Sequence, residues 1–94
     1  GGITLNVNRW LGQIGLESMS DSDIDAISLK KSGFLGEFYY FKLLNDKDQT
    51  AAILASIFQL KERTVFVKLS SSAAGVNEIE NDFLKFCNSL RQTS

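Results

Sequence analysis

Apolar residues near the start of the chain recur at helical spacing. The repeating set consists of Ile3, Val7, Trp10, Leu11 and Ile14. Such spacing places these side chains on one stripe of an amphipathic helix. Gly12 weakens the helix from within, and Gly15 is well placed to end it. A second, short helix is predicted from Ser20 to about Ala26, because Ser20 is followed three residues later by Asp23, a loose N-cap signature.

The middle of the chain changes to the composition of a sheet. Residues 27–31 are predicted to form a first short strand, and Ser32-Gly33 a turn or bulge. Residues 37–44 are rich in aromatic side chains, which favours a strand over a helix. The polar residues 45–49 that follow predict a turn.

Two further segments extend the predicted sheet. Residues 50–60 are rich in alanine, so the segment fits either a strand buried on both faces or a helix. Residues 64–69 alternate Val65, Val67 and Leu69 with other side chains and form the clearest strand pattern in the chain. The short connections between these segments imply antiparallel neighbours.

The last segment again has helical spacing. Its apolar set consists of Val76, Ile79, Phe83, Phe86, Cys87 and Leu90. Ser70, Ser71 and Ser72 precede it and are N-cap candidates. The chain is therefore predicted to be an α+β protein with the order α–α–β–β–β–β–α. An antiparallel meander of about four strands is flanked by N-terminal and C-terminal helices.

Length and charge limit the possible partners. Ninety-four residues form one domain at most, and 10 basic against 11 acidic residues give no attraction to a polyanion. Lys30, Lys31 and Lys42 lie near the aromatic segment, as in a surface on which single-stranded nucleic acid stacks. The predicted element order, however, lacks the helix between strands that an RNA-recognition motif needs, so we expect no nucleic-acid partner. The apolar runs are too short for a transmembrane segment.

The residues that most catalytic sites use are missing or poorly spaced. The chain contains no histidine, which removes Ser-His and Cys-His pairs and histidine zinc sites. Asp21, Asp23 and Asp25 begin like a calcium loop, but Ala26 stands where an EF-hand needs glycine. No glycine loop for phosphate is followed by Lys-Ser or Lys-Thr. We therefore expect no catalytic residues, cofactor or metal, and expect Cys87 to be a buried apolar side chain.

Polar residues are dense around the only tryptophan. Asn6, Asn8, Arg9 and Gln13 share the first predicted helix with Trp10. Their amide and guanidinium groups could bond to loop carbonyls, while a buried Trp10 would hold the helix on the sheet and need a partner for its N–H. We interpret these five residues as a structural anchor or an interaction site.

This opening block also carries a resemblance to a known family. Gly1-Gly2 followed by Asn6-Val7-Asn8-Arg9-Trp10-Leu11-Gly12-Gln13-Ile14-Gly15-Leu16 resembles the signature GG…NVNRWRGQ(L/I)GL of uncharacterised bacterial proteins, many of them exported proteins or lipoproteins. Ile53–Ile57 and Arg63–Leu69 continue the likeness more weakly, and Leu11 departs from the arginine that is usual in the family.

The resemblance implies a fold and a compartment, and no reaction. It implies a Mog1/PsbP-like α/β/α sandwich with further strands before the double glycine, so that this chain is a fragment or mature segment of a larger protein or domain. It also implies a location on the periplasmic side of the cell envelope. From these observations we expect a non-catalytic interaction or accessory module, whose partner is another protein or the missing N-terminal part of the same protein. The alternatives are a small-ligand-binding domain that uses Tyr39 and Tyr40 and, third, an enzyme that depends on serine and lysine.

Overall fold

The fold has two helices, four strands and a final helix, in that order. The structure is a computed structural model that describes residues 2–91. The elements are α1 (Ile3–Gln13), α2 (Asp21–Ile27), β1 (Leu29–Gly33), β2 (Gly36–Leu44), β3 (Ala52–Gln59), β4 (Thr64–Ser71) and α3 (Ala73–Ser89). The strands form one antiparallel sheet in the order β1-β2-β3-β4. The predicted α+β meander with helices at both ends is therefore confirmed.

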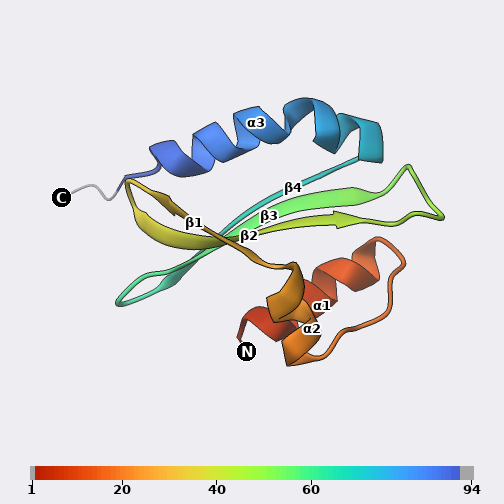
Figure 1. The fold of residues 1–94 in the computed structure, drawn as a ribbon, viewed down its shortest axis with the longest axis horizontal. Helices are drawn as coiled ribbons and strands as arrows, with labels where there is room; N and C mark the ends of the chain where they lie inside the picture. Colours follow the sequence, from red (N-terminus) through yellow and green to blue (C-terminus); the bar gives the residue numbers. More distant parts are fainter. Residues whose placement is uncertain (1, 92–94) are drawn as a thin grey trace.

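The helices cover the two faces of the sheet, so the fold has three layers. Figure 1 shows α3 along one face and α1 with α2 on the other. The two faces have separate cores because successive strand residues point to opposite sides. The core beneath α1 and α2 contains Val7, Trp10, Leu11, Ile14, Ile24, Phe41, Leu43, Ile53, Ala55 and Ile57. The core beneath α3 contains Phe38, Tyr40, Ala52, Leu54, Phe58, Val76, Phe83 and Cys87.

The alanine-rich segment that fitted both a strand and a helix is a strand. β3 lies between β2 and β4, and its residues from Ala52 to Phe58 are all buried. A central strand with helices on both faces has no solvent-facing side, so the usual alternation of apolar and polar residues is absent. The small side chains Ala52 and Ala55 then face the two helical layers without crowding them.

The first strand begins and ends two residues later than the sequence predicts. Ile27 is the last residue of α2, and β1 begins at Leu29 and continues to Gly33. Helix α2 ends because Ser28 is extended and its hydroxyl donates to the carbonyl of Asp25. β1 and β2 pair as far as Gly33, which lies opposite Gly36. Phe34 and Leu35 therefore form the turn.

The helix ends follow the capping patterns of the sequence. The Ser20 hydroxyl accepts the backbone N–H of Asp23, and the Ser72 hydroxyl accepts that of Gly75. Gly15 ends α1 with a φ of 81°. The backbone N–H of Leu16 bonds back to the Leu11 carbonyl over 2.9 Å, which is a Schellman motif.

Candidate functional site

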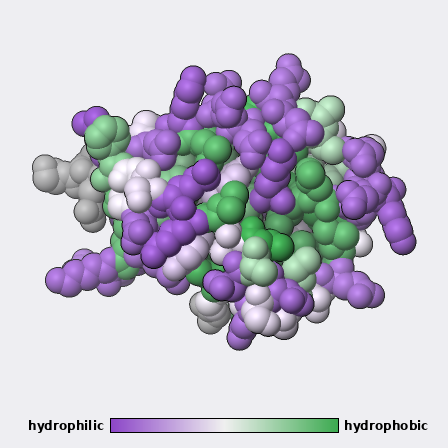
Figure 2. All heavy atoms as spheres, viewed as in Figure 1, coloured by the Kyte–Doolittle hydropathy of each residue, from purple (hydrophilic) through white to green (hydrophobic). Residues whose placement is uncertain are grey.

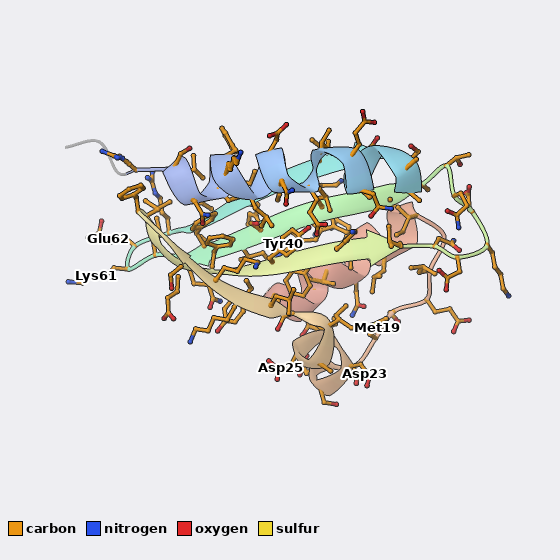
Figure 3. The ribbon with its side chains drawn as sticks, turned by 45° about the horizontal axis from the view of Figure 1, so that its top comes forward. Met19, Asp23, Asp25, Tyr40, Lys61 and Glu62 are labelled. Carbon is orange, nitrogen blue, oxygen red and sulfur yellow. The ribbon has the colours of Figure 1, made fainter. Side chains whose placement is uncertain are left out.

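The polar residues of α1 bond in different directions. Asn8 makes two hydrogen bonds with the backbone of Met19, which lies in the loop before α2. Its Nδ2 donates to the Met19 carbonyl over 3.0 Å, and its Oδ1 accepts the Met19 N–H over 2.7 Å. This pair fixes the loop, which Figure 3 shows passing from α1 to α2 around Met19. Asn8 is thus the residue of this set that bonds to a loop carbonyl.

The other polar residues of this helix do not join Asn8. Asn6 Nδ2 donates to the Gly2 carbonyl at the start of α1, and Gln13 Oε1 accepts from Lys68 Nζ on β4. Arg9 is exposed, and within residues 2–91 it takes part in no hydrogen bond or ion pair. These side chains therefore share no partner: Asn6 bonds within the start of α1, and Gln13 ties α1 to β4. Gly1, the first residue of the family signature, lies outside the described residues.

Trp10 is buried between α1 and the sheet. Its side chain is 6% exposed, and its ring meets the ring of Phe66 edge to face, with centroids 6.1 Å apart. Within residues 2–91 no hydrogen bond reaches its indole N–H. Every fully buried side-chain nitrogen and oxygen in this range has a partner, so the indole nitrogen keeps contact with water. Trp10 thus joins α1 to β4 by apolar packing alone.

Tyr39 and Tyr40 do not form one surface. As neighbours on β2 they point to opposite faces of the sheet. Tyr40 is buried beneath α3, where Figure 3 shows it between that helix and the sheet. Tyr39 packs against the other core and lines a hollow of about 140 Å³ with Asp21 and Asp25. That volume is well below the roughly 300–1,000 Å³ of a typical small-molecule site. The ligand surface expected from the two tyrosines together is not present.

A polar cluster holds α3 over β2. Glu80 on α3 accepts a hydrogen bond of 2.6 Å from the Tyr40 hydroxyl and one of 3.0 Å from Lys42 Nζ. These bonds, the one from Tyr40 first, hold the pKa of Glu80 below that of an ordinary glutamate. Burial, followed by the bond to Glu80, raises the pKa of Tyr40 far above its usual 10.0. Tyr40 therefore stays protonated and donates its hydroxyl hydrogen, while Glu80 stays ionised and accepts it.

We expect this cluster to make stability depend on pH. A carboxylate whose folded pKa is lowered stabilises the fold fully above its unfolded pKa, and the contribution is lost as the pH falls through the folded pKa. Glu80→Gln should therefore be less stable than the wild type at pH 7, with a difference that shrinks as the pH falls below the usual glutamate pKa. Denaturant unfolding at a series of pH values measures this difference.

Tyr40→Phe tests whether the bond from Tyr40 lowers the pKa of Glu80. Removing the hydroxyl should raise the pKa of Glu80 in an NMR titration, because the bond from Tyr40 is the largest single cause of its lowered pKa. A pKa of Glu80 that is no higher in Tyr40→Phe than in the wild type would contradict this cause.

Cys87 is buried beneath α3, as the sequence predicts. Its Sγ donates to the Ser56 hydroxyl of β3 over 3.3 Å. Burial raises the pKa of this thiol, which keeps it protonated at neutral pH. Ser56 is the buried polar residue of the core, and the thiol gives its hydroxyl a partner. The pair therefore satisfies a polar group inside the core.

The described residues contain neither a cluster of metal-ligating side chains nor a helix suited to a membrane. Across residues 2–91, no three His, Cys, Asp or Glu side chains are grouped so that they could hold a metal ion. None of the helices in that range is both long and apolar enough to span a bilayer. Figure 2 shows a surface with many polar residues, where apolar ones emerge between α3 and the two N-terminal helices.

The most distinctive surface lies along β4. This strand ends the sheet, so one side of its backbone pairs with β3 and the other has no strand beside it. Its register with β3 is continuous from Thr64 to Ser71, without a bulge. An edge of this kind presents a regular row of N–H and C=O groups that can pair with another strand.

Apolar side chains border the β4 edge on both faces of the sheet. On the α3 face, Phe86 is 53% exposed and lines a hollow of about 370 Å³ together with Val67 and Ile79. On the α1 face, Phe66 is 44% exposed and lines a hollow of about 300 Å³ together with Asn6. We define the β4 edge as Thr64–Ser71 together with Phe86 and Ile79.

The opposite edge of the sheet is blunted. β1 has five residues, against eight in β4, and includes Lys30 and Lys31. Lys30 forms an ion pair of 3.5 Å with Glu37, and the backbone N–H of Phe34, just after β1, donates to the Asn88 carbonyl of α3. Short, charged and partly covered edges resist strand addition. β4 has a single charged residue, Lys68, and is the more receptive edge.

No sequence motif marks β4 as a functional strand. A signal was present, because the last strand of a four-stranded meander lies at the edge of its sheet. The comparisons with known proteins add no functional residues: the chain matches no protein-family model, no curated protein and no solved structure.

Proposed function

We propose that this chain is a non-catalytic protein-interaction module and that the β4 edge is its interaction site. The observation that carries the proposal is a regular, eight-residue edge strand with no strand on one side, bordered by exposed Phe66 on one face and Phe86 on the other. Monomeric proteins generally protect such edges. Exposed aromatic side chains beside an open strand are what a partner segment would cover.

Strand addition explains why both features occur together. An extended partner would bond to the free backbone groups of β4, which supplies affinity with little dependence on sequence. Its alternate side chains would enter the hollows beside Phe66 and Phe86, which supplies specificity. The absence of histidine from the whole chain supports a role in binding over one in acid–base catalysis.

The resemblance of the opening block to exported bacterial proteins supports a place in the cell envelope. Helices on both faces of an antiparallel sheet fit the Mog1/PsbP-like arrangement that the resemblance implies. We infer from this that the chain serves as an accessory part of an envelope protein, with the β4 edge facing its partner. The likeness in fold bears on the compartment, and the β4 edge carries the interaction.

Site-specific photocrosslinking in cells that produce the protein would test the proposal. A benzophenone amino acid at Ser70, an exposed position of β4, should give a discrete crosslinked protein band. The matched control is the same amino acid at Leu29, an exposed position of the β1 edge. A band of equal strength at both positions, or none at Ser70, would count against an interaction through β4.

A further inference from the structure

We infer that the β1–β2 turn and the end of α3 form a clasp, two segments that open and close together while the rest of the fold stays closed. The clasp consists of Gly33 and Phe34 at the hairpin and of Asn88 and Arg91 at the end of α3. These segments are far apart in the sequence, but Figure 1 shows the hairpin meeting the end of α3. No residue of the clasp belongs to the β4 edge, so the clasp is independent of the proposed function.

The hairpin takes part in ending α3. Many helices end at a glycine with positive φ, whose backbone conformation lets the free carbonyls of the last turn find partners. After α3 this position is held by Leu90, with extended backbone angles of φ −61° and ψ 137°. The Asn88 carbonyl accepts the backbone N–H of Phe34 over 3.1 Å. A carbonyl at the end of the helix therefore obtains its partner from the hairpin.

Gly33 lets the hairpin approach α3 closely enough for this bond. A Cβ atom at Gly33 would lie 3.0 Å from the Cα atom of Asn88 and 3.2 Å from its carbonyl oxygen. Because these are backbone atoms, they cannot turn aside as the end of a side chain can. A side chain at this position would therefore push the two segments apart and strain the bond between Phe34 and Asn88.

Arg91 closes the clasp from the helix side. Its guanidinium lies over the Phe34 ring, 4.3 Å from the ring centroid. A cation in this position is attracted by the face of the ring, although weakly at an exposed site. The Phe34 side chain is 73% exposed even when the clasp is closed, so opening uncovers little apolar surface. Opening therefore costs far less free energy than unfolding the chain.

The shared contacts make the two segments open as one unit. Phe34 takes part in both the hydrogen bond to Asn88 and the contact with Arg91, so release of the helix end removes both of its partners. The rest of α3 stays in place, because Val76 and Phe83 hold it in the core beneath the helix. The opening is therefore local, and it occurs within the folded state.

Native-state hydrogen exchange of the purified chain, followed by NMR, tests the clasp. The two reporters are the amide at position 34, on the hairpin, and the amide of Leu90, which bonds to the Cys87 carbonyl at the end of α3. Phe34→Leu and Arg91→Gln should each lower the protection of both amides about two- to fivefold, the loss expected for one exposed cation–π contact. The double variant should lose no more than either single variant, because both changes remove the same contact.

Two control variants separate the clasp from general effects. Phe34→Tyr keeps an aromatic ring, and Arg63→Gln makes the same charge change in the turn between β3 and β4, so both should match the wild type at the two amides. Unchanged protection in Phe34→Leu and Arg91→Gln, or a fall at only one amide, would overturn the inference, since the segments would then not open together. A double variant that loses as much protection as the two single variants combined would also overturn it.

Discussion

Replacing Trp10 with alanine should destabilise the folded chain by about 3–5 kcal/mol, the usual cost of truncating a buried aromatic side chain. Trp10 is 6% exposed and packs in the core beneath α1. Its ring also meets Phe66 on β4, so the substitution would leave a cavity and loosen α1 from that strand. Urea unfolding followed by far-UV circular dichroism measures the loss.

The matched control is Phe34→Ala, because Phe34 is 73% exposed at the turn between β1 and β2. Its truncation should change the free energy of unfolding by less than about 1 kcal/mol. A chain of this length has roughly 5–14 kcal/mol of stability in total. Trp10→Ala should therefore remove a large share of it, and a loss no greater than that of Phe34→Ala would show that Trp10 does not anchor α1.

The helices could be predicted closely because their signals are local. Ser20 and Ser72 cap helices within three residues, and Gly15 supplies the backbone conformation that ends α1. The start of β1 was missed because its strand boundary depends on pairing with β2, which a local pattern does not contain. The alanine-rich β3 stayed ambiguous for a similar reason, since its two buried faces are created by helices far away in the sequence.

The candidate site was harder to predict than the fold. The polar residues around Trp10 look like a site in the sequence, but Asn8 bonds to Met19 and Gln13 to Lys68, in different directions. Neighbouring Tyr39 and Tyr40 lie on opposite faces of the sheet, so their adjacency in sequence misled. The β4 edge is defined by a missing neighbour, which becomes visible only when the strand order is known.

Phe58→Ala should lower the free energy of unfolding about as much as Trp10→Ala does, although Phe58 lies on the opposite face of the sheet. Phe58 is fully buried beneath α3, and its ring lies 4.7 Å from that of Phe38. Loss of this aromatic pair and the cavity left behind should cost about 3–5 kcal/mol. Phe58→Leu is the matched control and should cost about 1–1.5 kcal/mol, because it keeps most of the volume. If Phe58→Ala and Phe58→Leu lower the free energy of unfolding by nearly the same amount, the surrounding core collapses around the smaller alanine side chain.

Combining Trp10→Ala with Phe58→Ala tests whether the two cores support one cooperative fold. The two side chains lie on opposite faces of the sheet and belong to separate clusters, so their effects should add. The sum, about 6–10 kcal/mol, covers much of the stability expected for this length. We therefore expect the double variant to be largely unfolded in water at 25 °C, with little helical signal by circular dichroism. A double variant in which the α3 amides stay protected from hydrogen exchange while those of α1 do not would mean that the two faces fold independently and that the sheet does not couple them.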